Sequence, residues 1–301
     1  MNGILNIDKP AGMTSHDVVG RIRRVAHLKR VGHAGTLDPD ATGVLLVCLG
    51  PATRLADYLA AEGKDYRATL TLGATTTTED ASGEVLVRVD ASAIAEPDLA
   101  GLLPQFTGEI SQIPPMVSAL HHEGKRLYEL ARQGITVERA ARTITIDSIR
   151  LSDFVPGAAA SATLEVVCGK GTYIRTLCAD LGAALGVGGH MAALRRTRIG
   201  AFGIETAIPL DDLTPENIAA LLVSPSAALA HFPLYPLTQE SEVQDIAHGR
   251  SLVCELPEAA VVRIVDAENV LLALGRTDGE HLHPFKVFGE SSCALSTRFK
   301  S

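Results

Sequence analysis

Residues 32–49 read GHAGTLDPDATGVLLVCL and join an unusual loop to a strongly apolar segment. The segment Gly43–Leu49 is a continuous apolar run, as expected of a strand buried in a sheet. The loop before it, expected over about Val31–Thr42, concentrates glycines, a histidine and carboxylates. Because a rigid sheet fixes such loops, catalytic groups often lie on them. Asp38 and His33 are therefore candidate functional residues, although a turn aspartate and a structural histidine would explain them equally well.

Patterns on both sides of this loop predict helices and strands in the same domain. Gly3–Ile7 is a short apolar strand, and Thr14 and Asp17 have capping-box spacing for a helix that ends near Arg24. Tyr66–Leu72 alternates strictly between apolar and polar residues, which predicts a half-buried strand. Further predicted elements are a helix over 54–61, a polar loop over 75–83, strands over 143–151 and 162–168, and a helix capped by Thr172 with the apolar stripe Tyr173, Leu177, Leu181 and Leu185.

The C-terminal third has a different character. Recognisable motifs thin out beyond Ala207, and prolines and serines at 224–226 and 232–233 mark a linker. Three short strands, over 260–265, 270–274 and 282–288, then predict a small β module. We therefore expect a large domain over 1–233 and a small one over 234–301.

The composition is that of an ordinary globular protein. The chain has 301 residues, of which 46% are hydrophobic and 21% charged. No run of 18 apolar residues predicts a membrane span, and the first residues do not resemble a secretory signal. The 5 cysteines are odd in number and form no C-x-x-C pair, so we expect reduced thiols, no zinc site and a cytoplasmic location.

Charge neither excludes nor supports a nucleic-acid partner. The net charge is −8, but the first 200 residues carry equal numbers of basic and acidic residues, so the deficit lies in the final hundred. The clearest basic excess is at 121–142. This segment contains five basic residues (Lys125, Arg126, Arg132, Arg139 and Arg142) and three acidic ones (Glu123, Glu129 and Glu138). A solvated helix face would show the same pattern.

Short motifs follow one another in a fixed order over most of residues 3–200. They are DKPAGMTS at 8–15, GHAGTLDP at 32–39 with ATGVL at 41–45, KDY at 64–66, DASG at 80–83, PPMVSA at 114–119, GKRLYELAR at 124–132, and GKGTYIRTL at 169–177 with DLG at 180–182, GH at 189–190 and LRR at 194–196. Together these blocks resemble the TruB family of bacterial tRNA pseudouridine-55 synthases. The C-terminal part resembles the family less sharply.

The resemblance implies a fold, an activity and a partner. The fold would be α+β, with a pseudouridine-synthase catalytic domain around a mixed, largely antiparallel sheet and a small β-rich, PUA-like C-terminal domain. The activity would be isomerisation of uridine 55 in the T-loop of tRNA, with an insertion at about 117–142 clamping the T-arm. The protein would act as a monomer, with no cofactor and no metal.

The resemblance also assigns roles to single residues. Asp38 matches the catalytic carboxylate, Arg175 its charge partner, and Tyr66 the tyrosine that stacks on the target base and is a candidate for moving the C5 proton. The remaining assignments are His33, Asp80, Tyr173 and Leu194 around the flipped base, and Lys9, Lys125, Arg126 and Arg132 on the RNA.

Pseudouridine formation breaks the bond from ribose C1′ to uracil N1 and joins C1′ to uracil C5. No redox change occurs. A carboxylate can attack C1′, add to C6 of the base, or take a proton from the sugar, and the sequence does not choose among these routes. Each route needs an ionised, well-placed oxygen, which a planar guanidinium stabilises.

One residue departs from the family pattern, and two other functions compete. His121 stands where many members carry lysine, so we expect RNA binding to tighten modestly as the pH falls toward 6; a flat binding curve from pH 8 to 6 would contradict this. An RNA-binding module without chemistry would need only the basic segment and the C-terminal domain. A metal-dependent hydrolase would use His33, Asp38 and Asp40, but no metal-binding motif has the required spacing.

Overall fold

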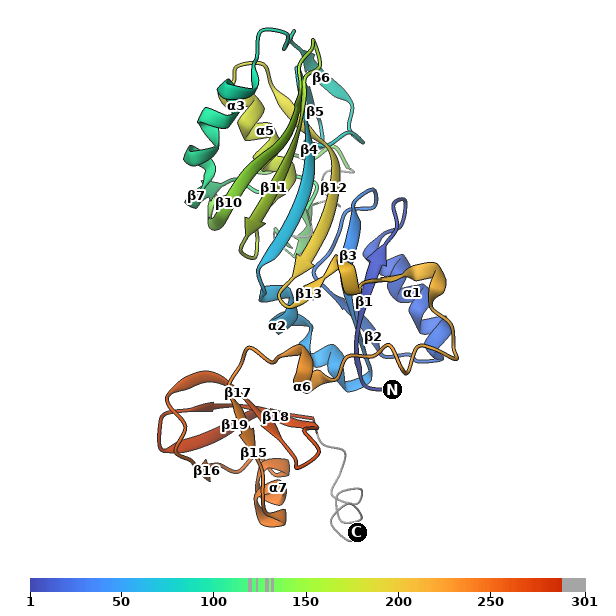
Figure 1. The fold of residues 1–301 in the computed structure, drawn as a ribbon, viewed down its shortest axis with the longest axis vertical. Coiled ribbons are helices and arrows are strands. Elements are labelled where there is room, and N and C mark those ends of the chain that lie inside the picture. The colour runs from blue at the N-terminus through green and yellow to red at the C-terminus, as the bar shows by residue number, and fades with distance from the viewer. Residues whose placement is uncertain (119–120, 123, 128–129, 131–132, 289–301) are drawn as a thin grey trace.

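The computed structural model describes residues 1–118, 121–122, 124–127, 130 and 133–288, and its largest feature is a ten-stranded sheet (Figure 1). Its strands are β1 (Gly3–Lys9), β2 (Val31–Ala34), β3 (Thr42–Leu49), β4 (Lys64–Leu72), β7 (Gly108–Gln112), β10 (Arg142–Val155), β11 (Ser161–Cys168), β12 (Gly189–Ile199), β13 (Phe202–Gly203) and β14 (Ile208–Pro209). Their order is β14-β1-β3-β12-β4-β11-β10-β7, with β2 beside β3 and β13 beside β12.

The sheet is mixed and largely antiparallel, which confirms the predicted α+β class. Among the described strands of this sheet, β1 runs parallel to β14 and β3 runs parallel to β12, whereas the other pairs are antiparallel. The β3–β12 junction depends on Gly43, whose φ is +100°. A Cβ there would lie 2.1 Å from the carbonyl oxygen of Arg196, so only glycine allows this close approach. The loop that carries Asp38 ends at this junction.

Helices pack against the sheet (Figure 1). The α-helices are α1 (Ser15–Ala26), α2 (Ala56–Ala61), α3 (Glu96–Leu102), α5 (Ile174–Ala184), α6 (Pro225–Ala228) and α7 (Glu240–Ala247), and the 3-10 helices are η1 (Gly50–Leu55), η2 (Leu103–Phe106), η3 (Ile204–Thr206) and η4 (Leu210–Asp212). The predicted capping box on α1 is confirmed: the side chain of Thr14 accepts from the amide of Asp17, and Asp17 accepts from the amide of Thr14. This cap fixes the start of α1 next to the Asp38 loop.

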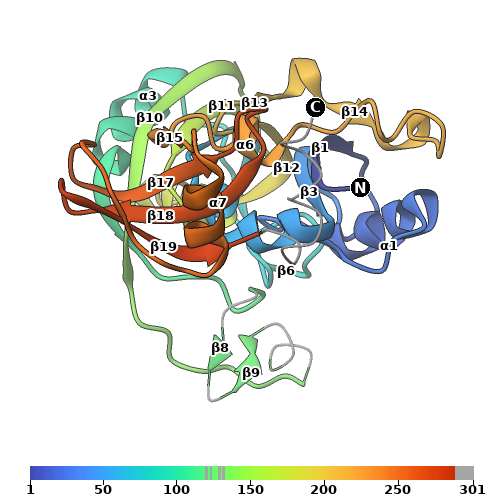
Figure 2. The same cartoon turned by 90° about the horizontal axis from the view of Figure 1, so that it is seen from below.

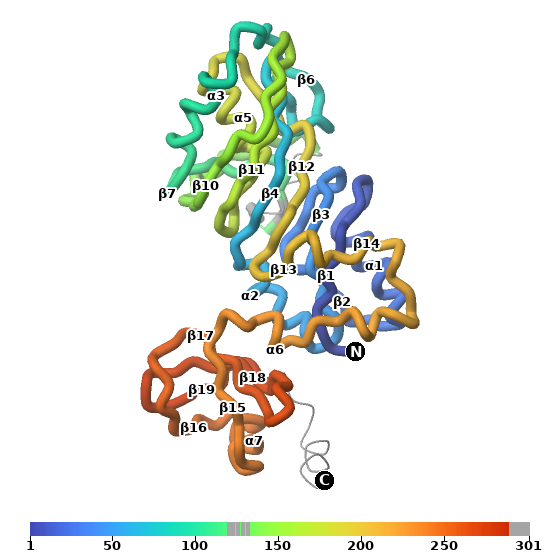
Figure 3. Tube along the Cα trace, in the orientation of Figure 1, coloured from blue at the N-terminus to red at the C-terminus, as the bar shows by residue number. Residues whose placement is uncertain are grey.

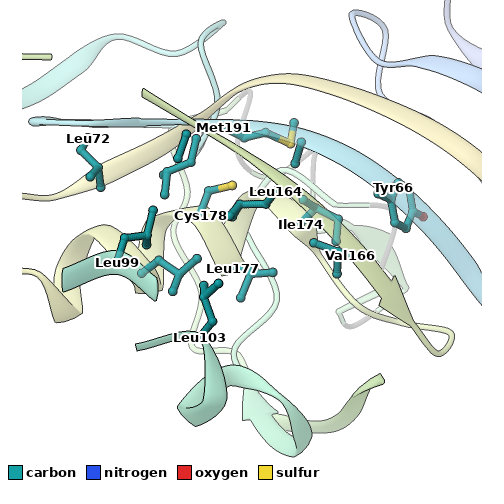
Figure 4. Packing of buried hydrophobic residues seen from close by; sticks show 14 of the residues in the cluster. Tyr66, Leu72, Leu99, Leu103, Leu164, Val166, Ile174, Leu177, Cys178 and Met191 are labelled. Atoms are coloured by element: carbon teal, nitrogen blue, oxygen red, sulfur yellow. The ribbon is translucent and has the colours of Figure 1, made fainter. Parts of the chain in front are cut away.

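The core under β4, β10 and β11 is filled from α5. Leu177 and Leu181 of α5 are fully buried, as the predicted stripe requires. The alternating face of β4 is also confirmed, because Tyr66, Ala68 and Leu70 are all buried. Figure 4 shows Tyr66 at one end of this cluster, so its ring joins the core at the edge where the functional cleft lies.

A second sheet forms the C-terminal module. Its strands are β15 (Leu234–Pro236), β16 (Leu252–Val253), β17 (Ala259–Val265), β18 (Leu271–Thr277) and β19 (His281–Val287), in the order β15-β17-β18-β19-β16. Figure 3 shows this module beside α2 and α6. There the Arg54 guanidinium lies 4.9 Å from the ring centre of Phe288, and Lys286 donates to the Arg54 carbonyl at 3.0 Å. The module therefore packs on η1, which is followed in the chain by α2 and then by β4.

Several predictions of local structure were wrong. The expected loop from Val31 begins with β2, which pairs with β3, and the expected loop at 75–83 includes strand β5 (Ala74–Thr76), paired with β6 (Val85–Arg88). Thr172 was predicted to cap α5, but the N-cap residue is Tyr173. The backbone amide of Tyr173 donates a hydrogen bond to the side-chain oxygen of Gln112 at 2.9 Å. The basic segment contains a two-stranded hairpin of β8 (His121–His122) and β9 (Lys125–Arg126), which stands apart from both sheets in Figure 2.

Candidate active site

An open cleft of about 1370 Å³ lies where the loop after β2 meets β4, β12 and the start of α5. This volume exceeds the roughly 300–1,000 Å³ of small-molecule pockets and suits a segment of a polymer. The cleft brings together six residues assigned from the sequence: His33, Asp38, Tyr66, Tyr173, Arg175 and Leu194.

A two-point ion pair forms the charged centre of this cleft. Arg175 Nε lies 3.0 Å from one carboxylate oxygen of Asp38, and Arg175 Nη2 lies 3.3 Å from the other. The Arg175 side chain is 5% exposed, whereas that of Asp38 is 37% exposed. The guanidinium therefore orients the carboxylate from behind and leaves it open to the cleft.

Arg175 is itself held by the turn before β6 and by the chain after β7. It donates to the carbonyls of Thr78 at 3.3 Å and Val117 at 2.8 Å. Asp80 lies behind it, with a carboxylate oxygen 3.8 Å from Nε. Asp80 does not line the cleft, because its other oxygen accepts from the side chains of Thr78 and Ser82 at 2.6 Å each. Asp80 is therefore a second carboxylate beside Arg175.

Burial sets the ionisation of the three central groups. Loss of solvent raises the pKa of Asp38 above its ordinary value of 3.8, although the neighbouring Arg175 offsets part of this shift. Burial also raises the pKa of the Tyr66 phenol, which keeps it protonated at neutral pH. For His33, burial lowers the pKa and keeps the imidazole neutral. Its Nδ1 is buried without a hydrogen-bond partner among the described residues.

Replacing Asp38 with Asn is expected to stabilise the folded chain at pH 7. Because the folded pKa lies above the unfolded value of 3.8, the folded wild type binds more protons between these two pKa values and loses stability as the pH rises through them. Asparagine stays neutral throughout. Thermal melts should therefore give the variant a higher Tm near pH 7, with the difference vanishing as the pH falls toward 4. A lower Tm for the variant at pH 7 would show that the Arg175 pair outweighs desolvation.

Of the basic residues assigned to RNA contacts, only the side chain of Lys9 lies within the described residues. Lys9 is fully buried, and its ammonium donates to the carbonyls of Pro10, Met13 and Pro39 at 2.6 to 2.8 Å. The assignment of Lys9 to the RNA surface was therefore wrong for this structure: the lysine fixes the loop that follows Asp38. The backbones of Lys125 and Arg126 form β9, but their side chains, and all of Arg132, lie outside the described residues.

Two buried cations of the cleft were missed from the sequence. Lys64 and Arg196 lie behind its surface, with side chains directed to backbone carbonyls. Burial lowers the pKa of Lys64 to about 8. Lys64 shares the buried face of β4 with Tyr66, and this two-residue spacing was the signal that could have found it.

The part of the chain described here offers no support for the hydrolase alternative. No group of three or more His, Cys, Asp or Glu residues within it is arranged to hold a metal ion. In that same part, no helix is long and apolar enough to cross a membrane.

Family profiles match most of the large sheet. The profile described as "TruB family pseudouridylate synthase (N terminal domain)" matches residues 23–174, and "tRNA pseudouridylate synthase B C-terminal domain" matches residues 175–221. The two matches meet at Arg175, and β12 of the second match pairs with β3 and β4 of the first. Both profiles therefore describe one continuous sheet in this structure.

Individual relatives and solved structures agree with these profiles. The "tRNA pseudouridine synthase B" of Pelotomaculum thermopropionicum is 42% identical over 98% of each chain, and that of Thermobifida fusca is 44% identical over 96% of this chain and 99% of its own. A crystal structure of a Cbf5-Nop10-Gar1 complex contains a similar chain with TM-score 0.73 and 31% identity, covering 95% of this chain and 85% of that one. An archaeal box H/ACA sRNP Nop10-Cbf5 complex gives TM-score 0.71 and 29% identity, over 96% and 87%.

Proposed function

This chain belongs to the TruB family of pseudouridylate synthases, and on that premise we propose that it converts uridine 55 in the T-loop of tRNA to pseudouridine. The observation that carries the proposal is the Asp38–Arg175 pair in a cleft that exposes the carboxylate and buries the guanidinium. Relatives named tRNA pseudouridine synthase B support the choice of tRNA as substrate.

Asp38 is the group to which we assign the bond change. Attack on C1′, addition to C6 and removal of a sugar proton all require an ionised oxygen that reaches the nucleotide. Arg175 supplies the positive charge that offsets the desolvation of this oxygen. The pair supports all three routes equally, because each of them needs only an ionised carboxylate oxygen that is open to the cleft.

Tyr66 is assigned to base stacking. Its ring lies at the end of the core cluster and faces the cleft, where a flipped uracil would meet it. The raised pKa of the phenol disfavours its anionic form, so stacking is better supported than removal of the C5 proton by the phenolate. Tyr173 and Leu194 are half-buried and would complete the wall around the base.

The target nucleotide must leave the T-loop stack before it can reach Asp38, at a cost of about a few kcal/mol. We assign His33 to the space that the nucleotide vacates, because its neutral imidazole can occupy a stacked region without adding charge. Residues 117–142 would clamp the T-arm through their basic side chains, within a catalytic unit of 1–233, and 234–301 would be an accessory PUA-like module. All of the assigned groups come from one chain, so the site needs no second copy.

The direct test is to incubate the purified chain with a T-arm stem-loop and with a full tRNA transcript, and then to map pseudouridine at each uridine. We expect product at the T-loop uridine corresponding to position 55 in both RNAs. A transcript in which that uridine is replaced by cytidine is the matched control and should give none. Absence of product at this uridine in both substrates, with folded protein, would overturn the proposal.

A further inference from the structure

We propose that Arg196 is a positioning residue for the reaction, because it joins the loop that carries Asp38 to the strand that carries Tyr66. The inference rests on the proposed function and assigns a role to a side chain that does not touch the substrate. Arg196 lies on β12, between β3 and β4 in the sheet, and its side chain has no exposed surface.

The hydrogen bonds of Arg196 go to backbone carbonyls of the loop and of β3. Its Nε donates to Val44 at 2.7 Å, and its Nη atoms donate to Gly35 at 3.0 Å and to Thr36 at 3.3 Å. A buried guanidinium is costly to desolvate, and none of these acceptors is a carboxylate. Such a group is better explained by the geometry that it imposes than by the stability that it adds.

That geometry concerns residues 35–41, the loop that joins β2 to β3 and carries Asp38. Arg196 holds two carbonyls just before the carboxylate, and the Ser15 side chain accepts from the amide of Leu37 at 2.9 Å. Lys9 holds the carbonyl just after it, at Pro39. Arg196 and Ser15 therefore both hold the chain on the N-terminal side of Asp38, and Arg196 is the one of the two that comes from β12.

Arg196 also reaches the tyrosine side of the cleft. It is the register partner of Tyr66 across β12 and β4, and its positive charge opposes the burial-driven rise in the pKa of Tyr66. One buried side chain therefore sets the position of the carboxylate loop relative to the residue on which the base would stack. Because its side chain has no exposed surface, its loss should affect turnover rather than RNA binding.

The test compares Arg196→Met and Arg196→Lys with a matched control, Arg263→Met. Arg263 is 9% exposed and donates to the carbonyls of Phe232, Ser226 and Ala230 at 2.9 to 3.3 Å, away from the cleft. Each variant is assayed for kcat and KM, for tRNA affinity by filter binding, for Tm, and for amide hydrogen exchange at residues 35–38. Arg196→Lys keeps the charge but loses the planar fork, so it remains informative if the Met variant unfolds.

We expect Arg196→Met to lower kcat by about 10²-fold, the cost of a misplacement of about 1 Å, with tRNA affinity unchanged and exchange at 35–38 accelerated. Arg196→Lys should lie between this variant and wild type. Arg263→Met should lower Tm without changing kcat or loop exchange. The inference is overturned if Arg196 variants lose only Tm, like the control, or if their whole defect is in tRNA affinity. If the wild type makes no pseudouridine, the proposed function fails. Unchanged amide exchange at residues 35–38 in the Arg196 variants would separately contradict the positioning role.

Discussion

Asp38→Asn is expected to abolish pseudouridine formation while tRNA binding is retained. All three possible routes need a carboxylate oxygen, and an amide cannot replace it as nucleophile or base. Loss of a catalytic nucleophile costs about 10⁴-fold or more in kcat, so no product should be detected in single-turnover reactions with excess enzyme. The same protein should bind tRNA with wild-type affinity, because the substitution removes one charge from the cleft and no basic side chain.

Asp40→Asn is the matched control for this variant. Asp40 lies two residues further along the same loop, is exposed, and does not line the cleft. It should keep full activity. If Asp38→Asn still forms pseudouridine, Asp38 is not the reacting group. If wild type itself only binds tRNA, the chain is an RNA-binding module without this chemistry.

Local patterns predicted those parts of the fold whose geometry depends on near neighbours. The alternation of 66–72 gave β4, and the spacing of Thr14 and Asp17 gave the start of α1, because both depend on side chains a few residues apart. β12 was not predicted, although it is central to the sheet. Its sequence contains three arginines, and two register shifts interrupt its alternation, so no strand period is visible.

The site could be predicted from the sequence only because the chain resembles a known family. Asp38 and Arg175 are 137 residues apart, and no spacing rule predicts that such residues meet. The resemblance placed Lys9 on the RNA, but this last residue of β1 is buried and three carbonyls surround its ammonium. Arg196 was overlooked because a buried arginine that binds only carbonyls has no sequence signature of its own.

Arg175→Met is expected to lower kcat by about 10³-fold, the second-largest effect. The substitution removes the charge that opposes desolvation of Asp38, so the pKa of Asp38 should rise further and its ionised fraction at pH 7 should fall. It also leaves Asp80 without its cation and the carbonyls of Thr78 and Val117 without a donor. Loss of these hydrogen bonds from a buried guanidinium should also lower the Tm of the variant.

The pH dependence separates this electrostatic role from simple loss of structure. A carboxyl group with a raised pKa ionises as the pH increases, so the activity of Arg175→Met should recover between pH 6 and 9 by a larger factor than that of wild type. Arg198→Met is the matched control, because Arg198 binds both carboxylate oxygens of Asp65 at 2.7 Å but lies outside the cleft. It should retain wild-type activity and the wild-type pH profile. An Arg175→Met profile parallel to that of wild type would mean that Arg175 places Asp38 without tuning its ionisation, since misplacement lowers the rate equally at every pH.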